Sequence, residues 1–317
     1  MARLPNNEAR KTIKSIFTHE KLRRDAKPRN THMNKLTFFS LTVLLLAPVA
    51  APHAAESKVV TNETKTKRGG ASVADTNLWH GFRKLNFSVD GRDCLLVFPA
   101  APAAGKPWIW RTEFFGHEPQ GDLALLSNGW HVAYIDVQNM YGAPVALDHM
   151  DRFYEHLTRQ FQLASKPVLE GFSRGGLFAF NWAARHPDRV ACLYVDAPVC
   201  DFKSWPAGWG RGKGSTNDWA RCKNVYGLDD KSARGYKLNP VDNLAPLAQA
   251  KIQILSVCGD ADEVVPMPEN TLLVKERYEK LGGEIKVITK PGVGHHPHSL
   301  RDPQPIVDFI LRHSYNN

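Results

Sequence analysis

A tight turn between a strand and a helix constrains the fold of this chain more than any other feature. Residues 171–176 read Gly-Phe-Ser-Arg-Gly-Gly, after a strand-like segment at 166–170 and before an apolar stretch with helical spacing at 177–185. Glycines on both sides of the serine permit a turn so tight that the serine backbone is strained and its hydroxyl projects from the end of the strand. The pattern predicts that Ser173 is a nucleophile, for which other segments must supply a base, an acid and an oxyanion hole.

Strands and helices alternate along the rest of the chain. Residues 83–98 are expected to form a β-hairpin that turns at Asp90-Gly91. Further strands are expected at 108–111, 130–137, 190–196, 251–258 and 284–289, and helices at 122–128, 146–161, 268–281 and 303–314. This alternation predicts an α/β fold with a mostly parallel central sheet, helices on both faces and the hairpin at an antiparallel edge.

Residues 197–245 interrupt this alternation. They are rich in Gly, Pro, Lys and Trp, with one short helix expected near 217–225. The stretch lies between two predicted core strands, so it should sit over the carboxyl ends of the strands, where open α/β sheets bind ligands. We interpret it as a small cap insertion.

The positive charge is concentrated at the start of the chain. The formal net charge is +9, but residues 1–32 carry +6 and Lys35 adds one more, so the residues after 55 carry only +2. That body lacks the basic stripe with which proteins neutralise a phosphate backbone. We therefore expect no nucleic-acid partner.

Residues 33–55 resemble a secretory signal peptide. A short basic start, an apolar core and small residues follow Met33, so residues 1–32 are interpreted as a mis-called upstream extension. The alternative is a membrane anchor, but the apolar run contains Pro48 and is shorter than the ~20 residues that a span needs. We expect a secreted or periplasmic protein without a stable membrane anchor, a flexible lead-in at 56–77 and one domain at 78–317.

The chain contains five cysteines. Cys200 and Cys222 flank the most irregular stretch, and we predict that they form a disulfide in an oxidising compartment. Cys94, Cys192 and Cys258 lie in apolar, strand-like runs and are expected to be buried thiols. No Cys-x-x-Cys motif or His-rich cluster indicates a structural metal.

Two later strands are followed by an acid and by a histidine. Residues 259–266 read Gly-Asp-Ala-Asp-Glu-Val-Val-Pro, and residues 290–298 read Lys-Pro-Gly-Val-Gly-His-His-Pro-His. With the serine turn, the order is Ser, Asp, His, and from about residue 80 to its end the chain resembles the α/β-hydrolase superfamily. The resemblance implies that Ser173 attacks an acyl carbon, that His295 is the base and that Asp262 orients it.

Neighbouring residues compete for two of these roles. Asp260 and Glu263 are alternatives to Asp262, but the superfamily places its acid three residues after the glycine. His296 and His298 are alternatives to His295, but the superfamily histidine directly follows its glycine.

The resemblance also implies an oxyanion hole made of two backbone N–H groups. One belongs to Arg174, directly after the nucleophile. The other should come from the loop after 108–111, where many relatives have His-Gly and this chain has Thr-Glu-Phe-Phe-Gly-His at 112–117. We choose the Glu113 N–H, with that of Phe114 as the alternative, and expect the Glu113 side chain to turn away and pair with Arg111 or Arg174. The Arg174 side chain either packs as an ion-pair partner or binds an anionic substrate.

Aromatic residues near the expected cleft are candidates for substrate binding. We single out Tyr141, on a loop after a core strand, and Trp219, in the insertion, although such rings also simply pack a lid. Trp205 and Trp209 lie in the same insertion.

The chain also resembles bacterial secreted esterases associated with polysaccharide breakdown, around 108–119 and 196–205. This implies hydrolysis of a small-molecule or oligosaccharide ester, in particular an acetyl ester, through an acyl-enzyme and without a cofactor. One alternative is a serine peptidase of the prolyl-oligopeptidase type, although such enzymes usually carry an N-terminal domain, for which the stretch at 56–77 is short. Another is a non-catalytic carbohydrate-binding protein on a hydrolase fold.

Overall fold

The computed structural model describes residues 75–314 of the 317-residue chain. The predicted upstream extension, the signal peptide and most of the lead-in lie outside the described residues. The first strand, β1 (Asp75–Trp79), pairs with β2 (Phe82–Val89). The folded domain therefore includes β1 and begins before residue 78, where we predicted its start.

The described residues form a nine-stranded sheet in the order β1-β2-β3-β5-β4-β6-β7-β8-β9. The remaining strands are β3 (Arg92–Phe98), β4 (Trp108–Arg111), β5 (His131–Ile135), β6 (Val168–Phe172), β7 (Cys192–Asp196), β8 (Gln253–Gly259) and β9 (Ile285–Lys290). β1, β2, β3 and β5 pair antiparallel, and every pair from β5 to β9 is parallel. The predicted hairpin at Asp90-Gly91 and the predicted mostly parallel sheet are confirmed.

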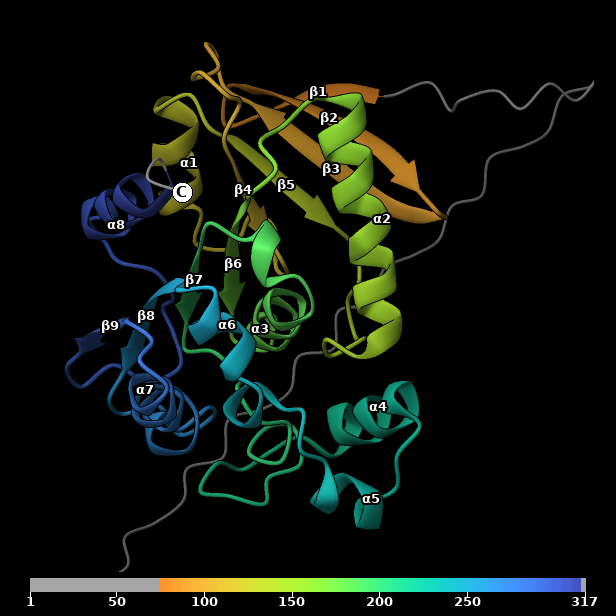
Figure 1. The fold of residues 1–317 in the computed structure, drawn as a ribbon, viewed down its shortest axis with the longest axis vertical. Coiled ribbons are helices and arrows are strands. Elements are labelled where there is room, and N and C mark those ends of the chain that lie inside the picture. Colours follow the sequence, from red (N-terminus) through yellow and green to blue (C-terminus); the bar gives the residue numbers. More distant parts are fainter. Residues whose placement is uncertain (1–74, 315–317) are drawn as a thin grey trace, which may run out of the picture. The chain divides into compact units, whose positions relative to one another are not determined.

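Helices cover both faces of this sheet (Figure 1). They are α1 (Gln120–Ser127), α2 (Pro144–Gln160), α3 (Gly175–Arg185), α4 (Thr216–Tyr226), α5 (Asp230–Gly235), α6 (Ala245–Gln249), α7 (Thr271–Lys280) and α8 (Gln304–Ser314). Residues of α2, α3, α6 and α7 share one apolar cluster with the sheet, and residues of α1 and α8 share another. The arrangement is the α/β-hydrolase fold.

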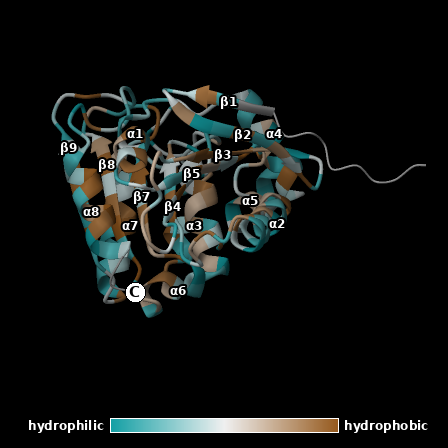
Figure 2. Ribbon diagram, turned by 90° about the horizontal axis from the view of Figure 1, so that it is seen from above, coloured by the Kyte–Doolittle hydropathy of each residue, from teal (hydrophilic) through white to brown (hydrophobic). Residues whose placement is uncertain are grey.

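The central strands are apolar because both of their faces are covered. All residues of β4, β5, β6 and β7 are buried, as expected for parallel strands between two helical layers. The Trp110 ring stacks on that of Trp108, with 5.5 Å between the ring centroids. It also packs edge-on against Trp182 of α3, with 5.0 Å between the centroids. Figure 2 shows apolar residues gathered on the strands and on the inward sides of the helices.

The predicted cap has a core of its own. Phe202, Trp219 and Ala233 pack with Tyr141 and Leu177 in a third apolar cluster. The predicted helix near 217–225 is α4, and α5 follows it. The last helix of the stretch, α6, instead packs against α3 at the sheet. The cap proper therefore ends before α6.

All five cysteines are buried and unbridged. The predicted disulfide between Cys200 and Cys222 is wrong. Cys200 packs in the cluster on the sheet, where its thiol donates to the Pro198 carbonyl at 3.5 Å, whereas Cys222 lies on α4 in the cap cluster. The predicted burial of Cys94, Cys192 and Cys258 is confirmed.

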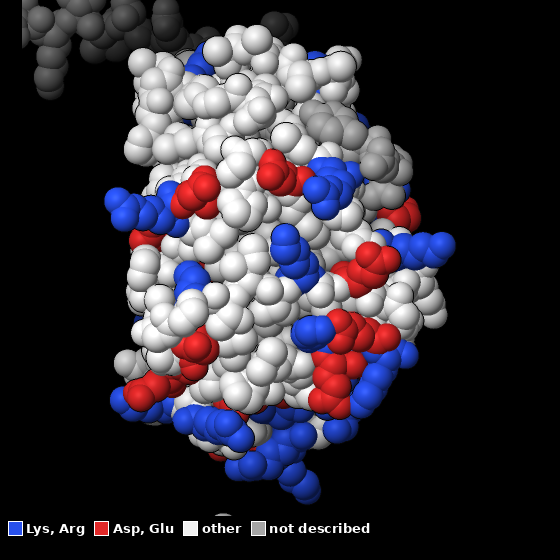
Figure 3. Space-filling view, turned by 90° about the vertical axis from the view of Figure 1, so that its left-hand side faces the viewer, with Lys and Arg blue, Asp and Glu red and all other residues white. Residues whose placement is uncertain are grey.

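Lys and Arg side chains alternate with Asp and Glu on the face that Figure 3 shows. Over the middle of this face the two signs lie close together rather than in separate patches. A mixed surface of this kind provides no continuous positive track.

Within residues 75–314, no helix combines the length and the apolar character needed to cross a membrane.

Candidate active site

The turn that holds Ser173 joins β6 to α3. Ser173 has a backbone φ of 50°, in a region that residues with a side chain rarely adopt. Its N–H donates to the Asp196 carbonyl at 2.9 Å, and its carbonyl accepts from the Val199 N–H at 2.8 Å. A Cβ at Gly171 would lie 2.8 Å from the Gly175 carbonyl oxygen, so only glycine fits there. The strained turn that the sequence predicts is therefore present.

Ser173, His295 and Asp262 form one chain of hydrogen bonds. The Ser173 Oγ lies 2.9 Å from His295 Nε2, and His295 Nδ1 lies 2.8 Å from Asp262 Oδ2. An ionised carboxylate only accepts, so His295 donates from Nδ1 and its Nε2 accepts from the serine hydroxyl. The other oxygen of Asp262 accepts from the N–H groups of Val264 and Val265, both at 2.8 Å. This geometry is the one that the predicted catalytic roles require.

Asp262 is the carboxylate of its turn that reaches a histidine. Asp260 and Glu263 are exposed, and the Asp260 side chain accepts instead from the Gly292 N–H at 2.6 Å. Burial by itself raises the pKa of Asp262, but the hydrogen bond from His295 and those from the backbone lower this pKa below its ordinary value. Asp262 is therefore ionised at neutral pH.

A close backbone contact holds the acid turn against the histidine loop. A Cβ at Gly259 would lie 2.0 Å from the Val293 carbonyl oxygen and 2.5 Å from that of Gly294. No side chain fits at this distance, so the glycine lets the two loops approach closely enough for Asp262 to meet His295.

The two alternative histidines are placed differently. His296 is exposed, and His298 is buried with its Nδ1 2.9 Å from Asp196 Oδ1. Burial, aided by the nearby rings of His295 and His296, lowers the pKa of His298 to about 2. His298 is therefore neutral, and its Nδ1 is engaged by the carboxyl group of Asp196, whose own pKa is raised by burial to about 7.

The loop after β4 lies against the serine turn. The Thr112 hydroxyl is 2.9 Å from the carbonyl oxygens of both Glu170 and Gly175, and a Cβ at Gly175 would lie 3.8 Å from the Glu113 nitrogen. In the described part of the chain, neither the Glu113 N–H nor the Arg174 N–H has a backbone acceptor. Both groups are thus available to a substrate oxygen and stay the predicted oxyanion donors, with the N–H of the next residue, Phe114, as the alternative.

The side chains of these two residues pair with each other. Arg174 Nε donates to Glu113 Oε1 at 2.8 Å, and Arg174 Nη1 lies 3.4 Å from Asp218 Oδ1 on α4. Arg111, the other predicted partner of Glu113, binds Asp122 instead at 2.6 Å. Arg174 is therefore a packed ion-pair partner that joins the serine turn, the β4 loop and the cap.

A cavity of about 650 Å³ opens over the serine and the catalytic histidine. Its other lining residues are Phe114, Phe115, His117, Tyr134, Asp136, Gln138, His296 and His298. From the sequence, Phe114 was expected only as a backbone donor, and the others were not expected to line the cavity. These residues could have been predicted to line the cavity, because Phe114 and Asp136 lie just after β4 and β5. The carboxyl ends of such strands form the edge of the sheet where ligands bind.

Tyr141 and Trp219 do not line this cavity, so their predicted role in substrate binding is not supported by the structure. Tyr141 is fully buried, and its hydroxyl donates to Asp218 at 2.7 Å. Trp219 is 9% exposed, packs against Phe202, and its Nε1 donates to Asp230 at 3.0 Å. Both rings are used in the core of the cap, which is the packing role that the sequence analysis left open.

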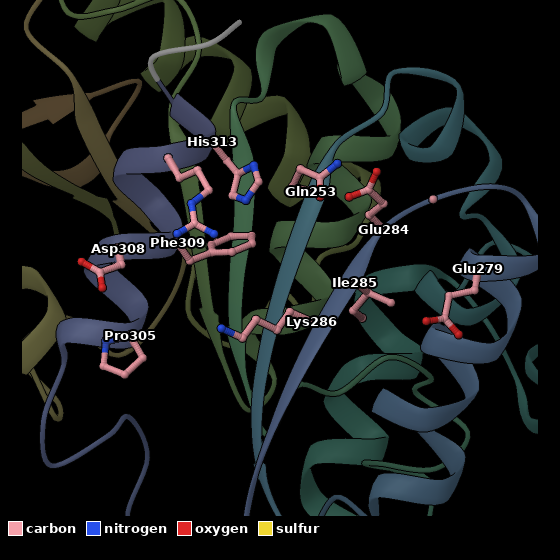
Figure 4. Close-up of a pocket in the computed structure, with 11 residues that line it drawn as sticks. Gln253, Glu279, Glu284, Ile285, Lys286, Pro305, Asp308, Phe309 and His313 are labelled. Carbon is pink, nitrogen blue, oxygen red and sulfur yellow. The ribbon is translucent and has the colours of Figure 1, made fainter.

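A second cleft lies at the edge of the sheet formed by β9 (Figure 4). Its side chains come from β9, from α8 and from the ends of neighbouring elements, and include Glu284, Lys286, Asp308, Phe309 and His313. Neither Ser173, His295 nor Asp262 lines it. We assign it no part in the chemistry.

Three histidines gather beside the catalytic residues. One ligand atom each of His117, His296 and His298 lies within 4.8 Å of the others. No metal site was predicted from the sequence, in which His117 follows β4 and is remote from the other two histidines. Only the fold brings it to them.

Comparison with known proteins establishes the family. The model of the prolyl oligopeptidase family matches residues 130–315, which is more than half of the chain and contains all three residues of the Ser–His–Asp arrangement. No curated protein matches the sequence.

Solved structures with the same fold are similar over most of this chain. An acylaminoacyl peptidase from Pyrococcus horikoshii matches with a TM-score of 0.57 and 15% identity, over 74% of this chain and 42% of that one. A puromycin-hydrolysing peptidase from Mycobacterium tuberculosis matches with a TM-score of 0.55 and 14% identity, over 74% and 38%. Dipeptidyl peptidase 4 from Porphyromonas gingivalis matches with a TM-score of 0.56 and 16% identity, over 76% and 35%.

The chain thus spans about two fifths of the length of these peptidases or less. At this level of identity the similarity shows the fold alone. These neighbours are peptidases, not the carbohydrate esterases that the sequence analysis favoured. The family match over residues 130–315 shows that the chain is a serine hydrolase of the prolyl oligopeptidase family, and the solved structures agree with its α/β-hydrolase fold.

Proposed function

We propose that this protein hydrolyses carboxylic esters through an acyl-enzyme on Ser173. The observation that carries the proposal is the continuous chain from the Ser173 hydroxyl through His295 to Asp262. The cavity of about 650 Å³ above it leaves room for a substrate at the serine.

The geometry accounts for both halves of the reaction. In the first half, His295 Nε2 takes the proton of Ser173 as its Oγ attacks the acyl carbon, and the ionised Asp262 stabilises the imidazolium. The same Nε2 then returns the proton to the leaving alkoxide, which departs as an alcohol. In the second half, His295 takes a proton from water, the hydroxide attacks the acyl carbon, and Ser173 is released with its proton restored.

The oxyanion that forms in each half needs donors that are already in place. The N–H groups of Arg174 and Glu113 are the proposed donors, and such a pair contributes about 3–4 kcal/mol per donor to the transition state in related chemistry. Ester hydrolysis is the least demanding reaction for this set of residues, because an alkoxide leaves more readily than an amine.

Peptide hydrolysis is the second candidate. Membership of the prolyl oligopeptidase family favours it, and the similar solved structures are named as peptidases. The same three residues would act, with His295 protonating an amine in place of an alkoxide. The finer prediction of acetyl esters on carbohydrate stays a proposal, and it loses the support of Tyr141 and Trp219 as sugar-stacking rings.

Hydrolysis of 4-nitrophenyl acetate tests the shared chemistry. We expect Ser173→Ala to lower kcat by about 10⁴-fold or more, and a fluorophosphonate probe to label the parent chain but not the variant. A Ser173→Ala chain as active as the parent would overturn the proposal. Absence of labelling of the parent would favour a non-catalytic binding protein instead.

A panel of substrates separates the candidates. Acetylated oligosaccharides, simple alkyl esters and acylaminoacyl 4-nitroanilides are compared by kcat/KM on the same preparation. Faster turnover of an anilide than of any ester would establish the peptidase. Equal turnover of all simple esters with no reaction of the sugars would exclude the carbohydrate esterase.

A further inference from the structure

We propose that His117, His296 and His298 form a three-histidine site for a divalent transition-metal ion such as Zn²⁺ in the wall of the cavity that holds Ser173. The three side chains each bring one ligand nitrogen to within 4.8 Å of the others, and all three line that cavity. The inference does not depend on the proposed function, because an ion can bind whether or not Ser173 reacts.

The type of ligand decides the type of ion. Imidazole nitrogen suits Zn²⁺, Cu²⁺ and Ni²⁺, whereas Ca²⁺ and Mg²⁺ prefer oxygen. Three protein ligands also leave a coordination position for water or another molecule. The open position of this site would face the cavity, since the three residues share its wall.

His298 is already oriented for metal binding. Its Nδ1 is 2.9 Å from the fully buried carboxylate of Asp196, whose other oxygen accepts from the Ser299 N–H at 2.8 Å. This contact leaves Nε2 as the nitrogen that can ligate. A carboxylate behind a ligating histidine fixes the orientation of the ring and raises its basicity, and it is the usual arrangement behind metal-bound histidines.

The backbone on both sides of the cluster is held in place. Arg111 Nη2 donates to the His117 carbonyl at 2.6 Å, and Lys290 Nζ donates to the carbonyl of Pro297 at 2.6 Å and to that of Ser299 at 3.3 Å. The two loops therefore present their histidines from fixed positions. The Lys290 ammonium is held on the Asp196 side of the cluster, where its Nζ lies 3.7 Å from Asp196 Oδ1.

A small movement completes the site. Nitrogen atoms around a tetrahedral zinc ion are about 3.4 Å apart, since each Zn–N bond is about 2.0–2.1 Å. Nitrogens that lie within 4.8 Å of one another therefore need to approach by at most about 1.4 Å. His117 and His296 are exposed, so their rings can turn toward the buried His298 at little cost.

The site is distinct from the catalytic histidine. The ring of His295 lies 4.9 Å from that of His296 and 5.0 Å from that of His298, centroid to centroid. Its two nitrogens are engaged by Ser173 and Asp262, so it is not counted among the ligands.

Zinc titration of the metal-stripped full-length chain, prepared without a histidine tag, tests the proposal. We expect calorimetry to show saturable binding of one Zn²⁺ per chain. His117→Ala and His296→Ala should each weaken this binding by at least about tenfold. Both residues are exposed, so these variants should fold, which thermal unfolding without metal verifies.

Matched histidines serve as controls. His80→Ala, at an exposed position outside the cluster, should bind zinc like the parent. Ser173→Ala should also bind zinc like the parent, so zinc binding is tested independently of the proposed hydrolase activity. Replacement of zinc by Co²⁺ should produce visible absorption bands that the His117→Ala chain lacks. Absence of saturable binding by the parent, or equal affinity in the parent, His117→Ala and His296→Ala chains, would overturn the site.

Discussion

Two aspartates of one turn show how local contacts separate similar residues. Asp260 and Asp262 both follow β8, and both accept hydrogen bonds from the backbone. Asp262 is buried and reaches His295, whereas Asp260 is exposed and reaches the Gly292 N–H. The difference lies in which loop each side chain meets.

Replacement of these aspartates tests the role of each. In Asp262→Asn the amide no longer stabilises the imidazolium and favours the wrong tautomer of His295, so kcat for a 4-nitrophenyl ester should fall by about 10³–10⁴-fold. Asp260→Asn is the matched control and should retain kcat within about twofold, because its side chain does not touch the reacting groups. Comparable losses in both variants would reject Asp262 as the orienting acid.

Glu113 introduces a pH-dependent contribution to stability. Its side chain is 1% exposed. Burial raises the pKa of Glu113 from 4.5 to about 7, although the adjacent Arg174 opposes the shift. Between these two values the folded chain retains a proton that the unfolded chain releases, so this contribution is present at low pH and is lost as pH rises toward 7.

Denaturant unfolding over a series of pH values checks this expectation. Glu113→Gln keeps the acceptor for Arg174 but cannot ionise. Relative to that variant, the free energy of unfolding of the parent should fall by up to about 3 kcal/mol from pH ~4 to pH ~8. Parallel profiles of the two chains would show that Glu113 titrates normally in the folded state.

At the scale of elements, the Asp218 carboxylate on α4 is one of the groups that couple the cap to the rest of the domain. The Tyr141 hydroxyl, on the loop before α2, donates to Asp218 on α4 at 2.7 Å, and Arg174 approaches the same oxygen to 3.4 Å. Asp218 also accepts from the Ser215 hydroxyl at 2.5 Å. This shared carboxylate joins α4, the loop before α2 and the serine turn.

Tyr141→Phe separates a packing role from a substrate-binding role. Loss of the hydroxyl should destabilise the protein by about 1–2 kcal/mol, because a hydrogen bond to a charged acceptor is removed. The KM for any ester substrate should not change, since the ring is outside the cavity, whereas Phe114→Ala in the cavity wall should alter it. A raised KM in Tyr141→Phe without loss of stability would instead support the predicted role of Tyr141 in substrate binding.

At the scale of the whole molecule, disulfide bonds do not contribute to the stability of the fold. All five thiols are buried and unbridged, and burial raises the pKa of the Cys222 thiol to about 12. A thiol that stays protonated reacts slowly with disulfides and alkylating agents. The fold therefore depends on its two sheet-covering clusters and on the smaller cluster of the cap.

Thiol counting checks this. The midpoint of thermal unfolding should be the same with and without a reducing agent, and an aromatic disulfide reagent should titrate all five thiols only after denaturation. Fewer than five reactive thiols in the denatured, unreduced chain would reveal a disulfide and would support the predicted bond between Cys200 and Cys222.

The sequence by itself determined the parts that depend on short-range patterns. The turn at Ser173 needs glycines at adjacent positions, and the acid and histidine loops each follow an apolar strand, so the fold class and the nucleophile could be predicted. The choice of Asp262 and His295 among their neighbours came from the resemblance to the α/β-hydrolase superfamily. The helix near 217–225 and the hairpin at 90–91 were predictable for the same reason, because their signals lie within a few residues.

Only the tertiary structure decided which distant residues meet. Tyr141 and Trp219 carry the same ring chemistry whether they face a cavity or a core, and burial in the cap settles the difference. Cys200 and Cys222 flank one stretch of sequence but enter separate apolar clusters, so proximity along the chain did not predict a bond. His117 joins His296 and His298 because the loops after β4 and β9 reach the same end of the sheet, a contact that no local pattern of sequence encodes.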